Sequence, residues 1–212
     1  EIGGRGLGAH PTRVRIALAL KGQPHDYRGV HLVRNEHLDA ELVGAAQQVP
    51  ALVLDDGTRL TQSLAILEFI EESFPTPALL PTDAHGRARV RSFAAMLAAD
   101  THPLITPRVK KYLTTQSGFD DAAWRAWQIH WFMTGLQALE QRLTTEPGTG
   151  TFCHGDTPTI ADICLASIIA VMRVFKIDVP GIPTVMRVMA ACEQLEAFAA
   201  ADPSRQVGAP KA

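Results

Sequence analysis

The sequence predicts an α/β domain followed by an all-α domain. Three observations support this fold class. Short helix and strand patterns alternate through residues 1–80, proline and glycine are concentrated in FPTPALLPTDAHG at residues 74–86, and the later patterns are all helical. We therefore expect an α/β domain at residues 1–80 and a helical domain at residues 86–212.

The first domain should begin with a helix and a strand. Residues 13–21, RVRIALALK, favour a helix, which Gly22 and Pro24 should end. Residues 25–32 are typical of a strand and residues 36–43 of a short helix. The glycine-rich start, EIGGRGLG, is a poor strand and precedes every predicted strand, so it lacks the context of a phosphate-binding loop.

A hairpin and an amphipathic helix complete the first domain. Residues 49–54 and 58–61 read as strands, and the Asp-Gly pair between them is a strong hairpin signal. Residues 63–73, SLAILEFIEES, place apolar side chains three and four positions apart. This spacing predicts a helix with one buried face.

The second domain shows only helical patterns. The predicted helices span residues 87–99, 104–115, 121–143, 160–175 and 183–201. Thr159 and Asp162 form a capping box that should fix the start of the fourth of these helices. Trp124, Trp127 and Trp131 follow helical spacing, so we interpret them as core residues.

Composition excludes several classes of function. The formal net charge of −2 argues against nonspecific electrostatic binding to nucleic acid or to an anionic membrane. No apolar run approaches the ~20 residues of a membrane helix, and EIGGRGLGAH lacks the apolar core of a secretory signal. We expect a soluble cytoplasmic protein.

The cysteines and histidines do not form metal-binding patterns. Cys153, Cys164 and Cys192 are odd in number, lack CxxC spacing and lie in apolar helical contexts. Buried free thiols are favoured over a disulfide or a metal role. The eight histidines are scattered without ligand spacing, so we expect no metal.

Gln62 and Ser63 stand where a predicted strand ends and a helix begins. The first N–H groups of a helix lack intrahelical partners, so a carboxylate could bind here. Ser63 could equally be only a helix cap. Pro50 lies just upstream, and either it is an ordinary strand-start proline or a cis Val49–Pro50 bond opens the strand edge to a peptide-like ligand.

A local basic cluster follows His102 and Pro103. Arg108 is suited to bidentate carboxylate binding, and Lys110 and Lys111 add positive charge. The alternative is a solvated helix face without a ligand.

These motifs together resemble the zeta class of glutathione transferases, the group of bacterial maleylacetoacetate and maleylpyruvate isomerases. The resemblance covers nearly the whole chain from Thr12. The matching segments are RVRIALALKG (13–22), QVPAL (48–52), TQSLAILEFIEE (61–72), FPTPALLP (74–81), DTHPL (100–104) and HGDTPTIADICLA (154–166).

The resemblance implies a thioredoxin-like glutathione-binding domain, a helical substrate domain and a homodimer. It identifies Pro50 with the family's cis-proline, Val49 with the residue that pairs with the cysteinyl backbone, and Gln62 and Ser63 with the γ-glutamyl carboxylate site. Further glutathione contacts would come from Gln48, from His37 at the glycine end, and from His102 and Thr106, which line the cleft with Arg108.

The implied reaction is a glutathione-dependent cis–trans isomerisation of a maleyl dicarboxylate. The glutathione thiolate adds to the double bond, the resulting single bond rotates, and elimination gives the fumaryl isomer. This chemistry requires a low thiol pKa and cations for the substrate carboxylates. Arg108 could supply one cation. Arg173 is a second candidate, but it stands one residue before the family's position, a turn of ~100° on a helix.

The start of the chain departs from the family pattern. Gly8 stands where the family has its thiol-activating serine, which leaves Thr12 and His10 as the nearby side chains able to donate to sulfur. A divergent site, an altered start of the chain and an incorrectly matched segment are all open. Two other functions therefore compete with isomerisation: a general glutathione transferase that conjugates electrophiles, and a glutathione-binding protein without turnover.

Overall fold

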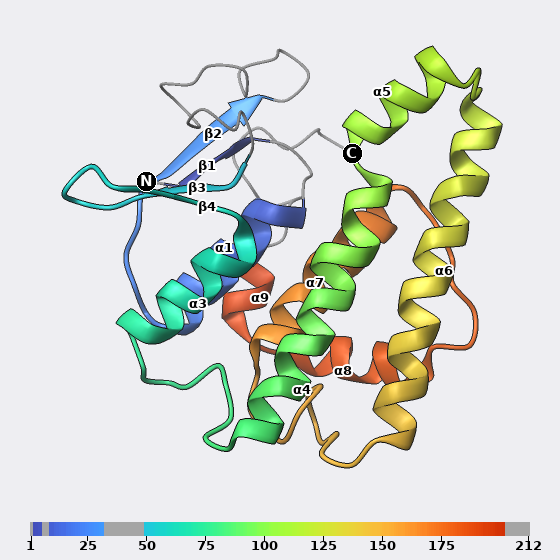
Figure 1. Ribbon diagram of the computed structural model, residues 1–212. Coiled ribbons are helices and arrows are strands. Elements are labelled where there is room, and N and C mark those ends of the chain that lie inside the picture. The colour runs from blue at the N-terminus through green and yellow to red at the C-terminus, as the bar shows by residue number, and fades with distance from the viewer. Residues whose placement is uncertain (1, 6–8, 32–48, 202–212) are drawn as a thin grey trace. The chain divides into compact units, whose positions relative to one another are not determined.

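The computed structural model describes residues 2–5, 9–31 and 49–201 (Figure 1). The chain forms two compact units, one of Glu1–Leu80 with Glu193–Ala212 and the other of Pro81–Cys192. The first unit contains a sheet and helices, and in the described part of the second every regular element is a helix. This confirms the predicted order of an α/β and an all-α part. The segment after Glu193, expected in the second domain, belongs to the first unit.

The first unit contains a four-stranded mixed sheet in the order β2-β1-β3-β4. The strands are β1 (Ile2–Arg5), β2 (Tyr27–His31), β3 (Ala51–Val53) and β4 (Arg59–Thr61). β1 runs parallel to β2 and antiparallel to β3, and β3 runs antiparallel to β4. The expected helix at residues 36–43 lies outside the described residues.

The strand β1 corrects the expectation for the glycine-rich start of the chain. Its sequence, IGGR, has low strand propensity because glycine loses much backbone entropy on folding. Ile2 nevertheless pairs with Tyr27 on one side and with Leu52 on the other. Pairing with two neighbouring strands therefore outweighs intrinsic propensity here.

The hairpin between β3 and β4 confirms the turn signal in the sequence. The Leu54 N–H donates to the Thr58 carbonyl at 2.9 Å, and the Gly57 N–H donates to the Leu54 carbonyl at 2.9 Å. Gly57 has a φ of 85°, which favours glycine because a side chain would be strained there. Both strands are shorter than predicted.

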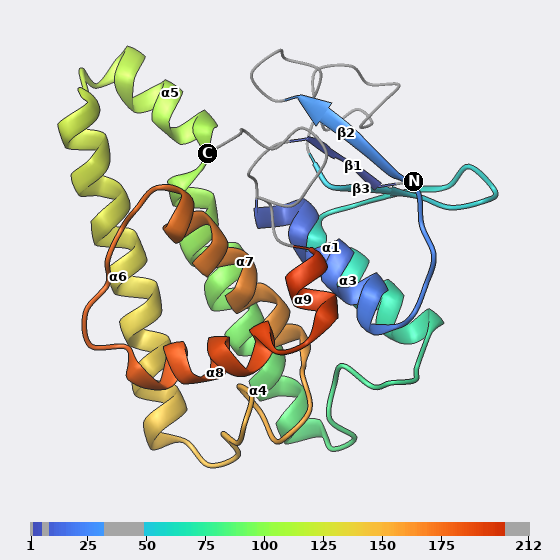
Figure 2. The same ribbon diagram turned by 180° about the vertical axis from the view of Figure 1, so that it is seen from behind.

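Two long helices pack together in the first unit, α1 (Ala9–Leu20) and α3 (Ser63–Ser73). Val14 and Ala17 of α1 and Ile66, Leu67 and Ile70 of α3 are fully buried. Figures 1 and 2 show the two helices side by side on one face of the sheet. The predicted amphipathic face of residues 63–73 is thus confirmed.

A buried ion pair joins the far ends of these helices. Lys21 Nζ lies 2.6 Å from Glu71 Oε2 and also donates to the Pro77 carbonyl at 2.6 Å. The Glu71 carboxylate accepts the Leu79 N–H at 2.9 Å and the Leu80 N–H at 3.2 Å. These bonds fasten the last residues of the first unit to α3.

The second unit is a helical assembly. Its elements are α4 (Ala84–Ala95), a π-helix η3 (Met96–Thr101), a 3-10 helix η4 (His102–Ile105), α5 (Pro107–Gln116), α6 (Asp121–Thr145), α7 (Ile160–Val174) and most of α8 (Pro183–Glu193). The last predicted helix, residues 183–201, is two helices in the structure, α8 and α9 (Glu196–Ala200), and α9 packs on α1.

The capping box at α7 is confirmed. The Asp162 carboxylate accepts the Thr159 N–H at 2.8 Å and the Thr159 hydroxyl at 2.7 Å. Its other oxygen accepts the Cys153 N–H at 2.8 Å. Burial raises the pKa of Asp162 although these hydrogen bonds oppose the shift. The cap therefore holds the loop before α7 as well as the helix start.

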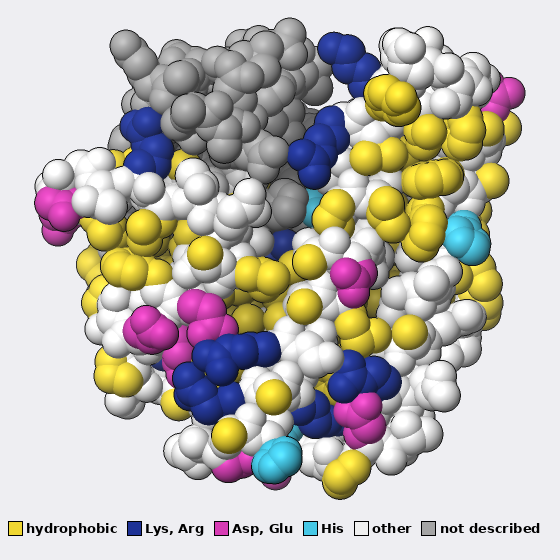
Figure 3. Space-filling model, in the orientation of Figure 1, with side chains coloured by type: hydrophobic (Ala, Val, Ile, Leu, Met, Phe, Trp, Pro, Cys, Tyr) yellow, Lys and Arg dark blue, Asp and Glu magenta, His cyan; other side chains and the backbone are white. Residues whose placement is uncertain are grey.

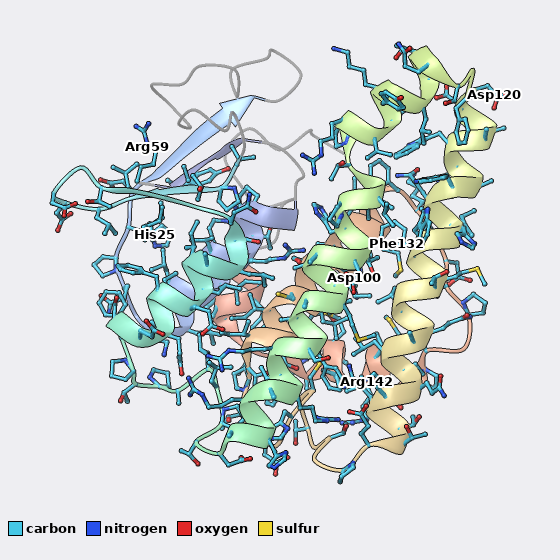
Figure 4. All side chains as sticks on the ribbon, viewed as in Figure 1. His25, Arg59, Asp100, Asp120, Phe132 and Arg142 are labelled. Carbon is cyan, nitrogen blue, oxygen red and sulfur yellow. The ribbon has the colours of Figure 1, made fainter. Side chains whose placement is uncertain are left out.

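One arginine of α4 and one of α6 contact a buried phenylalanine. Arg89 and Arg142 lie over the Phe93 ring, with 4.4 and 4.5 Å from each guanidinium carbon to the ring centroid. Both side chains also bind Glu146. Figure 4 shows Arg142 between α4 and α6. Cation–π contacts and a shared carboxylate thus link the two helices.

The three tryptophans of α6 differ in burial. Trp124 is buried, as predicted, whereas Trp127 and Trp131 are half-buried. The Trp127 ring contacts Phe119 and Trp131 edge to face, at 6.0 and 5.6 Å between centroids, and its Nε1 donates to the Leu104 carbonyl at 2.7 Å. Figure 3 shows apolar side chains on the surface over α5 and α6. The core interpretation is therefore wrong for Trp127 and Trp131.

The cysteines are free and buried, which confirms the interpretation as thiols. Within residues 2–5, 9–31 and 49–201 no helix is long and apolar enough to cross a membrane. In the same described part, no group of three or more His, Cys, Asp or Glu side chains could hold a metal ion.

Candidate functional site

The junction of β4 and α3 has an unusual backbone. Gln62 is the N-cap of α3, with φ 68° and ψ 111°. A positive φ is uncommon outside glycine, and such strained residues cluster at binding and active sites. The Gln62 side chain is exposed, whereas Ser63 directly after it is only 5 % exposed.

Ser63 is the first residue of α3 and not its cap. The capping alternative for this serine is therefore wrong, because the N-cap position belongs to Gln62. The Ser63 hydroxyl oxygen accepts a hydrogen bond from Arg13 Nη1 at 3.0 Å. The N–H groups of the first turn of α3 have no intrahelical partners, and the helix dipole adds positive potential. The junction is suited to an anion.

Arg13 brings a positive charge to this junction from α1. Its side chain is 0 % exposed, although arginine is rarely buried unless it is paired. The pattern of residues 13–21 predicts Arg13 and Arg15 only as helix formers, and it does not predict that both are buried. The available signal was two arginines inside the otherwise apolar run RVRIALAL.

The strand register brings the two candidate ligand-binding segments together. Ala51 of β3 pairs with Thr61 of β4. Pro50 precedes Ala51 and Gln62 follows Thr61, so the two segments lie at the same end of the hairpin. The Val49–Pro50 bond is cis, as predicted. Pro50 is buried and Val49 is half-buried.

The start of α1 belongs to the same end of the sheet. Gly3 of β1 pairs with Ala51, and the antiparallel direction places Arg5 toward the end that holds Pro50. α1 begins at Ala9, four residues after Arg5 and thus within about 15 Å of it along the chain. His10 is the second residue of α1.

Thr12 lies in the interior of the first unit. It is 2 % exposed, and its hydroxyl accepts from Arg15 Nη2 at 3.2 Å. The same nitrogen donates to the Ala201 carbonyl at 3.0 Å, and the Arg15 guanidinium lies over the Tyr27 ring. Thr12 is thus buried beside Arg15, whose guanidinium also bonds to the residue that follows α9.

The candidates of the second unit lie on three elements. His102 begins η4 and is buried, Thr106 is the N-cap of α5, and Arg108 is exposed on α5. The Thr106 hydroxyl donates to the Pro103 carbonyl at 2.9 Å. Arg173 is exposed in the last turn of α7. His102 and Arg108 therefore differ in accessibility despite their closeness in sequence.

The basic cluster on α5 is partly neutralised. Lys110 Nζ lies 2.9 Å from the Asp121 carboxylate, and this ion pair lowers the pKa of Asp121, chiefly through the hydrogen bond from Lys110. Arg108 and Lys111 are exposed. The predicted site residues His37 and Gln48 lie outside the described residues, as does Gly8, which stands at the family's serine position.

The chain is similar to glutathione S-transferases. Sequence profiles of the N-terminal and C-terminal domains of glutathione S-transferase match residues 9–73 and 121–200. A maleylpyruvate isomerase from a Ralstonia species is 46 % identical over 197 residues, which cover 92 % of each chain.

Solved structures give the same result. The holo structure of a maleylpyruvate isomerase, described as a bacterial zeta-class glutathione S-transferase, has a TM-score of 0.94 and 42 % identity. A maleylacetoacetate isomerase from Methylobacterium extorquens AM1 with bound malonate and glutathione has a TM-score of 0.95 and 40 % identity. Each comparison covers 99 % of both chains.

Proposed function

The chain belongs to the zeta class of the glutathione S-transferase family, and on this premise we propose that it is a glutathione-dependent cis–trans isomerase of maleyl dicarboxylates. Maleylacetoacetate or maleylpyruvate is converted to its fumaryl isomer. The N-terminal unit is the thioredoxin-like glutathione-binding domain, and the helical unit supplies substrate contacts.

One observation carries the proposal in this chain. The register of β3 and β4 sets the Val49–Pro50 segment beside the Gln62–Ser63 junction. A tripeptide could pair its cysteinyl backbone with Val49 in the manner of an added strand. Its γ-glutamyl carboxylate would then bind Gln62, Ser63 and the N-terminus of α3.

The reaction uses the thiol of glutathione as a temporary nucleophile. The thiolate forms a C–S bond to one alkene carbon, and the alkene electron pair moves toward the adjacent carbonyl as an enolate. The remaining C–C single bond rotates. The enolate electrons then re-form the double bond and expel the thiolate, so glutathione is not consumed. The negative charge of the enolate and the two carboxylates requires nearby cations.

We assign the thiol and substrate roles to residues of both units. His10, near the N-terminus of α1, and Thr12 are proposed as donors to the sulfur, with the helix dipole lowering the thiol pKa. Arg108 and Arg173 are proposed to bind substrate carboxylates. The remaining assignments place His37, Gln48, His102 and Thr106 at glutathione.

The proposed enzyme is a cytoplasmic homodimer. Family membership supports the dimer, and light scattering after size-exclusion chromatography measures the assembly directly. A molecular mass of one chain at micromolar concentration would contradict the dimer.

A second function is favoured by one position. Gly8 stands where the family has its thiol-activating serine, which favours a protein that binds glutathione without turnover. A glutathione-affinity column, combined with turnover assays on maleylpyruvate, maleylacetoacetate and an aryl halide, separates the functions. Retention with isomerisation supports the proposal. Retention without turnover leaves a binding protein, conjugation alone leaves a general transferase, and no retention contradicts all three.

A further inference from the structure

We propose that Arg13 is a positioning residue that fixes the Ser63 hydroxyl as a hydrogen-bond donor to the carboxylate of the ligand. This inference rests on the proposed function, because it assumes that Ser63 binds the γ-glutamyl carboxylate of glutathione. It adds a residue of α1, fifty positions away in sequence, to the recognition of that group.

The contact is buried on both sides. Arg13 is 0 % exposed and Ser63 is 5 % exposed. Arg13 Nη1 lies 3.0 Å from Ser63 Oγ. Fully buried apolar residues on both helices, Val14 on α1 and Ile66 and Leu67 on α3, belong to the same core. The Ser63 hydroxyl is therefore hydrogen-bonded to a fully buried guanidinium group.

The chemistry of the two groups decides the direction of the hydroxyl hydrogen. A guanidinium can only donate hydrogen bonds, whereas a hydroxyl can accept and can donate one hydrogen. Because Arg13 donates to the Ser63 oxygen, the serine hydrogen must point to an acceptor. Within the described residues the Ser63 hydroxyl makes no other hydrogen bond. The hydroxyl is therefore presented as a donor.

A carboxylate is the ligand group that this arrangement favours. An ionised carboxylate only accepts hydrogen bonds, so it matches a hydroxyl donor and the N–H groups of the first turn of α3. Donation from the guanidinium also polarises the hydroxyl, which strengthens the bond that the hydroxyl gives in turn. A neutral ligand without the carboxylate would lose this match.

A purely structural role for Arg13 can be distinguished from a role in ligand binding, because a second buried polar contact joins the same two helices. Lys21 and Glu71 connect the other ends of α1 and α3. They lie eight residues beyond Arg13 and Ser63, or about 12 Å along each helix. Lys21→Met removes a buried cation between the same helices without touching Ser63, so it is a matched control.

The test compares two ligands on each protein. Calorimetry gives the Kd of glutathione and of 4-aminobutyryl-cysteinylglycine, which lacks only the α-carboxylate of the γ-glutamyl residue. The wild type should prefer glutathione by about tenfold or more. Arg13→Met should lower this preference at least about threefold, and Lys21→Met should leave it unchanged. A general loss of packing would weaken the binding of both ligands equally and leave the preference unchanged.

Two further variants make the result decisive. Arg13→Lys keeps the charge but loses the planar geometry, and should lower the preference by at least about twofold. If the Arg13 variants that fold keep the wild-type preference for glutathione over the ligand without the α-carboxylate, the inference is overturned. Ser63→Ala should also lose the preference. If it does not, the assignment of Ser63 fails, and if the wild type binds no glutathione, the proposed function itself fails.

Discussion

Replacing Ser63 with alanine should weaken glutathione binding and protein stability by separate routes. The variant removes one charge-assisted hydrogen bond to the ligand carboxylate, which contributes ~1.5–3 kcal/mol, or an affinity change of about 10- to 150-fold. It also removes the hydroxyl oxygen that accepts a hydrogen bond from Arg13, a residue that is 0 % exposed. Loss of the partner of a buried donor costs ~1–3 kcal/mol, or a fall in Tm of about 2–12 °C for a chain of this size.

Two measurements and a matched variant test this reasoning. Isothermal titration calorimetry gives the glutathione Kd, and thermal unfolding followed by circular dichroism gives Tm. Ser92→Ala is the control, because Ser92 also accepts a hydrogen bond from an arginine, Arg142, at 2.8 Å in the second unit. It should lower Tm without changing the Kd. Native affinity in a folded Ser63→Ala protein would refute the carboxylate role and leave this serine a structural part of the α1–α3 contact.

Three further changes probe the substrate site and the helix caps. Arg108→Ala should raise the KM for the dicarboxylate more than the KM for glutathione in steady-state assays, whereas equal effects would place Arg108 on glutathione. Glu140 accepts two N–H groups at the start of α8, at 3.0 and 2.8 Å, and Glu140→Ala should lower the free energy of unfolding in urea by ~2–4 kcal/mol; a loss below ~1 kcal/mol would contradict this. The Gly86 N–H lowers the pKa of Asp83, so this cap stabilises α4 above the unfolded pKa of ~3.9 and loses its effect as pH falls through the folded pKa. Asp83→Asn should therefore lower Tm relative to the wild type at neutral pH but not in acid. A difference in Tm that is the same at both pH values would contradict a role for the ionised Asp83 carboxylate.

The elements that the sequence predicted well carry strong local signals. Asp-Gly in the hairpin and the spacing of apolar residues in 63–73 each specify one conformation, and the start of α3 at Ser63 agrees with the prediction. Thr159 and Asp162 likewise define the start of α7 through bonds between residues three apart. In these segments local and long-range preferences agree.

The elements that the sequence mispredicted depend on distant partners. β1 forms from a glycine-rich segment because β2 and β3 pair with it on both sides. The predicted helix at residues 87–99 ends in the π-helix η3, which packs on α6 at Gly135, where a β-carbon would lie 2.1 Å from Thr101 Oγ1. The close approach of two helices at a glycine depends on the tertiary fold, so it cannot be predicted from a local segment of the sequence.

The candidate site was predictable only in part for the same reason. Pro50, Gln62 and Ser63 lie near one another in sequence, so their association followed from a single hairpin. Arg13 reaches Ser63 only because α1 packs on α3, and this contact joins residues fifty positions apart. Arg15, which bonds to Thr12, also bonds to Ala201, and this contact joins residues still further apart in sequence.

The most direct test of the central claim is proton NMR of maleylpyruvate with a trace of the purified protein, with and without glutathione. We predict that the cis alkene signals are replaced by trans signals over many turnovers only when glutathione is present, and that free glutathione stays constant. Accumulation of a stable glutathione adduct, or no change beyond the uncatalysed rate, would contradict an isomerase that uses the glutathione thiol as a recycled nucleophile.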